Sequence, residues 1–275
     1  MTEPDVRELL PELEADLYAF VERSPRNAMP AHGGMRIYDA PLVGVAAAED
    51  PLFGEFRAPG VIGPHFMPPQ EWLPDARSVV CYFLPFTPEV RVSNRAPGLP
   101  SEEWVSARID GEAFNMDVRR FLAGWLRERG AQALVPPLDE RYSVEKRVSN
   151  WSERHAAYAA GLGTFGLHRA LITEKGSAGR LGSVVTTLAL PATRRPYTRY
   201  NQYCLFYARG ACGACIRRCP PHAITPQGKD HAICSDYLDH TVEPLFKPRY
   251  GCAKCNVGVP CEAKNPTAGE NVGSA

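Results

Sequence analysis

The distribution of cysteine constrains this chain more than any other feature of its sequence. Nine cysteines occur among 275 residues, and eight of them lie at or after position 204. The N-terminal stretch lacks the basic and apolar segments of a secretory signal, so we expect a cytoplasmic chain. In a reducing compartment a dense group of thiols is more often metal-binding than disulfide-bonded. The group consists of Cys204, Cys212, Cys215, Cys219, Cys234, Cys252, Cys255 and Cys261.

The spacing of three of these cysteines matches the later part of a bacterial ferredoxin motif. Cys212, Cys215 and Cys219 are separated by two and then three residues, and Pro220 follows directly. In that motif the last cysteine binds the second cluster of a pair, not the cluster bound by its neighbours. Eight thiols therefore predict two 4Fe–4S clusters with interleaved ligands.

The crossover rule predicts which cysteines belong together. We expect one set to contain Cys204, Cys212, Cys215 and Cys261, and the other to contain Cys219, Cys234, Cys252 and Cys255. Arg209 stands where the motif usually has its first cysteine, and the more distant Cys204 takes that role.

Two structural zinc sites are the alternative, because zinc also binds four thiolates with two-residue spacing. The interleaved order and the Cys-Pro ending favour iron. The ninth cysteine, Cys81, lies in an apolar run and is expected to be a buried core thiol.

Hydrophobic periodicity predicts an α+β fold. We expect helices over 5–22, 102–129 and 152–160, strands over 41–48, 78–86 and 182–190, and loops over 57–75 and 87–101. An α/β core domain would then occupy residues 1–195, and a small, turn-rich cysteine domain would occupy residues 196–275.

Charge and hydropathy argue against two classes of partner, although a small basic patch stays compatible with zero net charge. Lysine and arginine balance aspartate and glutamate at 31 each, which argues against an extended nucleic-acid surface. No run of about 18 apolar residues occurs, so we expect no membrane span.

Residues 149–190, SNWSERHAAYAAGLGTFGLHRALITEKGSAGRLGSVVTTLAL, precede the cysteine segment. A helix that leads into a Gly-Leu-Gly turn, then a leucine-rich strand and a strand opened by Gly-Ser, resembles the epoxyqueuosine reductase family and the related reductive dehalogenases. The resemblance extends over residues 140–261. It implies a nitroreductase-like core that holds cobalamin, followed by a ferredoxin-like domain with two 4Fe–4S clusters.

The resemblance also implies a route for electrons. A low-potential donor such as ferredoxin or flavodoxin would reduce the clusters, and these would reduce a bound cobalamin that acts on a small-molecule substrate or a corrinoid protein. Counted without a gap, the family's proton-donating aspartate falls at Arg147, and a guanidinium group cannot act as that acid. A gap in the alignment would bring Asp139 or Glu145 to this position instead. We therefore predict a cobalamin-dependent oxidoreductase whose substrate is not epoxyqueuosine.

Candidate catalytic residues lie on the helix expected at 152–160. Glu153 falls where the family has a glutamate, and His155 and Tyr158 share one helix face from which both could donate protons. The cofactor-binding candidates are Arg147, Gly161, Gly163, Thr164, Phe165, His168, Arg180 and Ser183. A packed histidine and tyrosine, a close chain approach at the glycines and solvated arginines are the alternative roles.

Two other functions remain open from the sequence. A ferredoxin-type electron-transfer protein would reduce a partner's corrinoid or flavin, whereas a flavin-binding reductase would hold flavin in its own core. The run Gly161-x-Gly163-x-x-Gly166 also matches a dinucleotide fingerprint. Because it follows a helix and not a strand, we do not expect a Rossmann site there.

Overall fold

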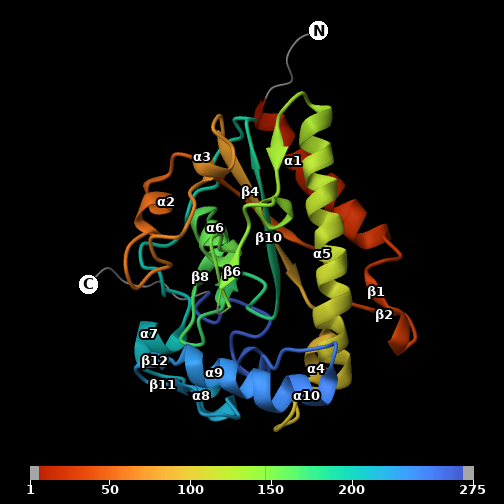
Figure 1. The fold of residues 1–275 in the computed structure, drawn as a ribbon, viewed down its shortest axis with the longest axis vertical. Coiled ribbons are helices and arrows are strands. Elements are labelled where there is room, and N and C mark those ends of the chain that lie inside the picture. Colours follow the sequence, from red (N-terminus) through yellow and green to blue (C-terminus); the bar gives the residue numbers. More distant parts are fainter. Residues whose placement is uncertain (1–5, 146, 269–275) are drawn as a thin grey trace.

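A four-stranded antiparallel sheet forms the centre of the computed structural model, which describes residues 6–145 and 147–268 (Figure 1). The strand order is β3 (Leu42–Ala47), β4 (Ser78–Pro85), β10 (Gly179–Thr186) and β5 (Ala133–Leu134). All eight residues of β4 are buried, as the apolar run in the sequence predicts. The register places Ser78 opposite Thr186 at one end of the sheet and Pro85 opposite Gly179 at the other.

Two long helices cover one face of this sheet. Helix α1 (Val6–Arg23) packs against α5 (Glu102–Glu128), and α5 packs on β10. Helix α5 begins where Ser101 Oγ accepts a hydrogen bond from the Trp104 backbone N–H, and it ends before Gly130, which has a φ of 79°. Alternate strand residues, among them Val80 and Tyr82, point into this part of the core.

Helix α6 (Glu153–Ala159) covers the other face, together with the short helices α2 (Pro51–Glu55) and α3 (Pro69–Trp72). The intervening strand residues Val79 and Cys81 point to this side. Cys81 is fully buried and free, which confirms its expected role as a core thiol.

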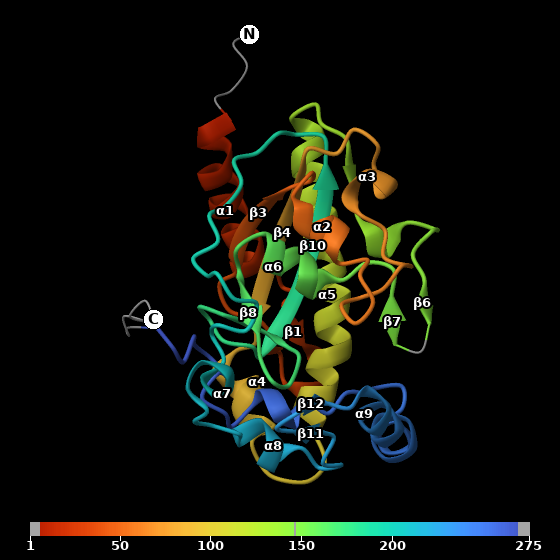
Figure 2. The ribbon, with the colours of Figure 1, turned by 90° about the vertical axis from the view of Figure 1, so that its left-hand side faces the viewer.

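The cysteine segment lies at one end of the sheet, as Figures 1 and 2 show. It contains α7 (Leu205–Arg209), α8 (Ala214–Arg218), β11 (Ile224–Thr225), β12 (Gly228–Lys229), α9 (His231–Tyr237), η3 (Leu238–Val242), α10 (Glu243–Phe246) and η4 (Lys254–Asn256). The remaining short elements are β1 (Ala28–Met29), η1 (Pro30–His32), β2 (Met35–Arg36), α4 (Pro88–Ser93), η2 (Pro136–Leu138), β6 (Val144–Glu145), β7 (Val148–Ser149), β8 (Gly163–Phe165) and β9 (Leu171–Thr173).

Hydrogen bonds and an ion pair join the cysteine segment to the sheet core. The Ser177 backbone N–H donates to the Cys261 carbonyl at 2.9 Å, and the Asn94 side-chain amide donates to the Cys252 carbonyl at 2.9 Å. Arg95 donates two hydrogen bonds to Glu262, at 2.7 and 3.1 Å. The cysteines are therefore held at fixed positions against the core.

The mixed helix-and-sheet class expected from the sequence is confirmed, whereas several boundaries are wrong. The expected loop 87–101 contains α4, because Thr87 caps a helix that starts at Pro88. Likewise α3 lies within the expected loop 57–75. The strand expected at 182–190 runs from 179 to 186, and its last expected residues leave the sheet. No helix of the described ranges is long and apolar enough to cross a membrane. The domain boundary at 195 remains a prediction.

Candidate cluster and cofactor site

The eight clustered cysteines surround two separate cavities. Cys204, Cys212, Cys215 and Cys261 all line a small cavity between the cysteine segment and residues 167–172 of the core. Cys219, Cys234, Cys252 and Cys255 all line a larger cavity of about 660 Å³ between this segment and the core. We call these groups the first and the second thiol set. The division coincides with the one expected from the crossover rule, and cluster binding by these thiols remains a prediction.

The chemistry of the thiols suits a metal centre. All eight are free of disulfide bonds. Burial raises the pKa of Cys215 to about 11, and that of Cys255 and Cys261 to about 12; thiolates of the same set raise each pKa further. Such groups ionise only beside compensating positive charge, which a bound metal ion or cluster would supply. No three His, Cys, Asp or Glu side chains among residues 6–145 and 147–268 converge on a single-ion site, and each thiol set instead surrounds a cavity.

His168 lies between the two cavities and contributes to the wall of both. Its Nδ1 accepts a hydrogen bond from the Ala170 backbone N–H at 3.0 Å. Nδ1 is therefore unprotonated, so the proton sits on Nε2, which lies 3.3 Å from Cys261 Sγ and donates to it. Burial lowers the pKa of His168 to about 3, which keeps the ring neutral.

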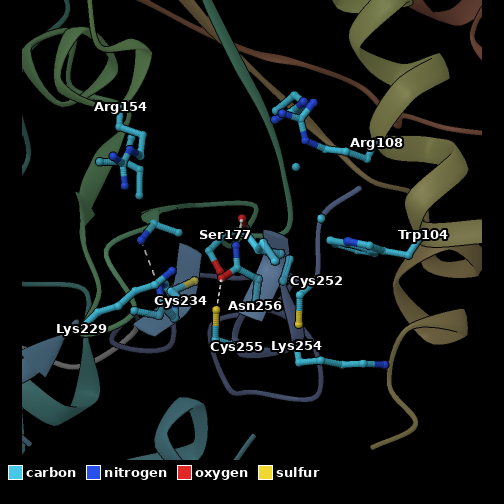
Figure 3. Close-up of a pocket in the computed structure, with 18 of the residues that line it drawn as sticks. Trp104, Arg108, Arg154, Ser177, Lys229, Cys234, Cys252, Lys254, Cys255 and Asn256 are labelled. Carbon is cyan, nitrogen blue, oxygen red and sulfur yellow. Dashed lines mark hydrogen bonds between the residues drawn. The ribbon is translucent and has the colours of Figure 1, made fainter. Parts of the chain in front are cut away.

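The core side of the larger cavity carries a network of charged side chains from α5, α6 and β10. Arg119 donates to Glu112 at 2.9 Å and to Glu153 at 3.1 Å. Arg180 lies 2.9 Å from Glu112, and Arg108 also borders the cavity. Figure 3 shows Arg108 and Arg154 on one side of the cavity and Cys234, Cys252 and Cys255 on the other.

Glu153 borders this cavity, and its two carboxylate oxygens are occupied. Oε1 accepts from Arg119, and Oε2 accepts from Ser183 Oγ at 2.5 Å. Trp151 in turn donates to Ser183 at 3.0 Å, so Ser183 lies behind Glu153 and does not line the cavity. Burial raises the pKa of Glu153, while Arg119 and the Ser183 hydrogen bond oppose that shift. The carboxyl group thus fixes Arg119 in place.

Arg180 offers a buried hydrogen-bond donor to a ligand. Its Nε is shielded from solvent and has no hydrogen-bond partner among the described residues, although Arg180 lines the cavity. Buried donors without a partner are uncommon in folded proteins, and a bound acceptor oxygen would satisfy this one. Carboxamide, phosphate and carboxylate groups all carry such oxygens.

Two of the candidate catalytic residues lie away from the cavity. The His155 ring packs between Phe56 and Phe165, at centroid distances of 5.0 and 4.8 Å, and its Nδ1 lies 2.7 Å from Ser152 Oγ. Burial lowers the pKa of His155 to about 3. The Tyr158 ring stacks on Tyr197 at 5.3 Å. Neither lines the cavity, so packing accounts for both side chains.

The glycine turn also serves packing. A Cβ atom at Gly163 would lie 2.1 Å from the Ile172 carbonyl oxygen, so only glycine allows β8 and β9 to approach so closely. Gly161 has a φ of 80°, and Thr164 Oγ1 accepts from the Tyr203 backbone N–H at 2.8 Å. Phe165 packs on His155. These four residues support the site from behind and do not line the cavity.

Arg147 lies at the cavity edge, on the hairpin formed by β6 and β7. Its guanidinium group forms an ion pair with Asp239 of η3, in the cysteine segment. Arg147 therefore connects the hairpin to the helical run on the opposite side of the cavity.

Sequence reasoning missed most of the cavity wall. The missed residues include Trp104, Arg108, Glu112 and Arg119 from α5, and Lys229, Tyr237 and Tyr250 from the cysteine segment. The α5 residues carried a usable signal in the sequence, because charged residues at helical spacing share one helix face. The structure shows that one of them, Arg119, is only 3% exposed. Arg108 also donates to the Tyr250 hydroxyl at 2.9 Å, which ties the two parts together.

The chain has a mixed core of sheet and helices, followed by a cysteine segment. Solved structures of other proteins share this fold. No protein-family model matches the sequence, and no curated protein matches it. Among solved structures, the fold is that of epoxyqueuosine reductase. One such structure, labelled with selenomethionine, aligns with a TM-score of 0.55 and 18% identity over 94% of this chain and 66% of that chain. A second, bound to an epoxyqueuosine-modified tRNA stem loop, gives the same values.

The Bacillus subtilis epoxyqueuosine reductase aligns with a TM-score of 0.54 and 17% identity, over 94% of this chain and 66% of that chain. A catabolic reductive dehalogenase aligns less well, with a TM-score of 0.49 over 71% of this chain, and supports no part of the assignment. The resemblance expected from the sequence is thus confirmed at the level of the fold. This chain spans 66% of the length of the epoxyqueuosine reductase structures.

Proposed function

We propose that this chain is an iron–sulfur oxidoreductase that passes electrons through two 4Fe–4S clusters to a corrinoid bound in the larger cavity. The observation that carries the proposal is the division of eight free cysteines into two sets of four, of which the second lines a cavity large enough for a ligand. Four thiolates around each cavity are the ligand set of a 4Fe–4S cluster. The shared fold with epoxyqueuosine reductase supports the same class of chemistry.

The positions of the thiol sets suggest the direction of electron flow. Cys212 of the first set is exposed, so a cluster held there could receive electrons from outside the protein. The second set borders the cavity and would deliver them to a bound cofactor. His168 contributes to the walls of both cavities and spans the step between them.

The cavity wall fits a corrinoid. Such a cofactor, when bound, supplies low-potential reductive chemistry, and its rim carries carboxamides and a phosphate. Arg180 Nε provides an unsatisfied donor, and Arg108, Arg154 and Lys229 add positive charge to the wall. His168 is the sole histidine among the described cavity residues. Because both of its nitrogens are engaged, it is not a ready axial ligand.

The substrate we propose is a small molecule other than epoxyqueuosine. The position that corresponds to the proton-donating aspartate is occupied by Arg147, which pairs with Asp239. Glu153 is committed to Arg119 and Ser183. Tyr237 and Tyr250 contribute phenol groups to the cavity wall. The Tyr250 oxygen accepts from Arg108, which leaves its own O–H free to donate.

Equilibrium binding of cobalamin and of flavin mononucleotide to anaerobically reconstituted protein tests this proposal. We expect cobalamin to bind and its absorption bands to change when a low-potential reductant is added. Arg180→Gln should weaken cobalamin binding about tenfold, the loss of one charge-assisted hydrogen bond. The matched control is Arg77→Gln, at the far end of the sheet.

Three outcomes separate the alternatives. If the protein binds flavin tightly and does not bind cobalamin, the flavin-binding reductase replaces the corrinoid-dependent enzyme as the function. Binding of neither cofactor, with both clusters present and reducible, would leave an electron-transfer protein. Zinc without acid-labile sulfide in the purified protein would exclude all three functions.

A further inference from the structure

A long stretch of this neutral chain is devoid of acidic residues. Residues 175–229 contain nine lysines and arginines and no aspartate or glutamate, although each class totals 31 in the whole chain. The nine are Lys175, Arg180, Arg194, Arg195, Arg199, Arg209, Arg217, Arg218 and Lys229. The stretch includes the first three thiols of the first set, so positive charge is concentrated in the sequence around one proposed cluster.

Several of these cations have partners inside the protein. Arg195 pairs with Asp50 at 2.5 Å, and Arg180 pairs with Glu112. Arg218 donates to the carbonyl groups of Lys254 and Arg95. The hydrogen bond from Arg218 to Arg95 joins the cysteine segment to the core, whereas the Arg195 and Arg180 pairs lie within the core.

Three exposed arginines of this stretch belong to the segment that carries the first thiol set. Arg199 and Arg217 are exposed, and neither forms an ion pair within the described residues. Arg217 donates to the Cys212 carbonyl at 3.4 Å, which places it directly at the exposed cysteine of the first set. Arg209 is also exposed and lies at the end of α7, three residues before Cys212.

Two exposed tyrosines accompany these cations. Tyr200 is 59% exposed and Tyr207 is 36% exposed. The pKa of Tyr207 is raised by burial and then by the nearby Tyr200 and Cys204, so the two rings lie next to the first thiol set. Arginine and tyrosine are the residue types enriched in protein–protein interfaces.

We infer that this face, formed by Arg199, Tyr200, Tyr207, Arg209 and Arg217 beside the first thiol set, docks an acidic, low-potential electron-transfer protein. The inference rests on the proposed function, because it requires a cluster in the first thiol set. Each encounter moves one electron: the donor is oxidised by one electron and the cluster is reduced from the 2+ to the 1+ state, with no proton transferred. Opposite charges on the two partners raise the rate of productive encounters.

A nucleic acid fits this face less well than an acidic protein. Neutralising a duplex requires a row of cations that follows the phosphate backbone, whereas these few cations lie beside a single thiol set. The chain as a whole also lacks the basic excess of nucleic-acid-binding domains.

Stopped-flow reduction of the reconstituted protein by flavodoxin hydroquinone, followed by the bleaching of cluster absorbance, tests the inference. Arg199→Glu combined with Arg217→Glu should lower the second-order rate constant at low salt by about tenfold and flatten its dependence on ionic strength. Arg199→Glu alone breaks no hydrogen bond to the cysteine loop and should show a smaller loss in the same direction. Arg77→Glu is the matched control, and iron and sulfide content should stay the same in every variant.

Reduced methyl viologen reduces clusters without a docking surface. It therefore tests the proposed function separately from the docking face. If viologen fails to bleach the wild-type clusters, the proposed function itself is wrong. If viologen reduces every protein equally and flavodoxin also reduces the double variant at the wild-type rate, only the docking face is wrong. Loss of binding to an RNA stem loop in the double variant, with unchanged reduction by flavodoxin, would assign the face to nucleic acid and overturn the inference.

Discussion

At the scale of single residues, His168 is notable because hydrogen bonds at both ring nitrogens fix its orientation and tautomer. The Ala170 backbone N–H fixes its tautomer, and the resulting Nε2–H donates to Cys261 Sγ. A hydrogen bond to a ligand sulfur stabilises the reduced, more negative cluster. His168→Leu should therefore lower the reduction potential of one cluster by about 60 mV, which corresponds to about 1.4 kcal/mol for a one-electron couple.

A redox titration followed by electron paramagnetic resonance measures this shift. His168→Gln, which keeps a side-chain N–H, should shift the potential less than the leucine variant does. Unchanged potentials for both clusters in His168→Leu would show that the N–H···S contact has no electronic role.

Cys204 is the cluster ligand whose assignment depends most on the structure. The ferredoxin spacing places Arg209 at the usual position, and only the fold shows that Cys204 lines the same cavity as Cys212, Cys215 and Cys261. Cys204→Ala should reduce the iron content from about eight per chain toward about four and should leave the spectrum of the other cluster intact. Cys81→Ala, in the sheet core, is the control and should retain all the iron. Two normal clusters in Cys204→Ala would mean that another group is the ligand.

At the scale of elements, the sequence identifies those whose signal is local. The strand β4 and the helix α5 can be predicted from the sequence. The apolar residues of each follow the pattern of a buried strand or of an amphipathic helix within that segment alone. Helix α4 was missed because its proline and serine content suggested a loop, although Thr87 caps it and proline is favoured in a first helical turn. The helical run from α9 to α10 was missed for a similar reason, since Pro244 interrupts its pattern.

The turn before β8 illustrates how a motif of glycines can serve a strand pair instead of a cofactor. Gly163→Ala should destabilise the protein by about 2 kcal/mol or more, because the added methyl group would meet the Ile172 backbone, which cannot move away easily. Gly124→Ala, in α5, has open space around the new atom and should be neutral or stabilising by up to about 1 kcal/mol. Urea unfolding measures both changes. Equal stabilities for the two variants would contradict the close approach of β8 and β9.

At the scale of the whole molecule, the site exists only because distant segments meet. Arg108 and Arg180 come from a helix and a strand of the core, whereas Tyr250 and Cys252 come from the cysteine segment. Sequence spacing could group the cysteines, since their ligand pattern is local and repeated. It could not reveal the wall opposite them, because which face of α5 meets the cysteine segment is decided by tertiary packing.

The same arrangement predicts how the protein responds to loss of its metal. Residues 196–268 contain only short helices and one hairpin. Three of the eight thiols are buried and four are half-buried, so without iron this segment would hold a group of unpaired cysteines at its centre. The sheet core has hydrophobic clusters of its own on both faces of β4 and should remain folded.

We therefore expect removal of iron with a chelator under anaerobic, reducing conditions to unfold the cysteine segment selectively. Hydrogen exchange should lose its protection over residues 204–261 and keep it over β4 and β10, because local opening is set by the contacts that each region retains. Reconstitution with iron and sulfide should restore the protection, whereas treatment of the Cys81→Ala variant should give the same pattern as the wild type. If β4 loses protection together with the cysteine segment, the clusters support the entire chain; if neither region changes, the thiols hold their positions without metal.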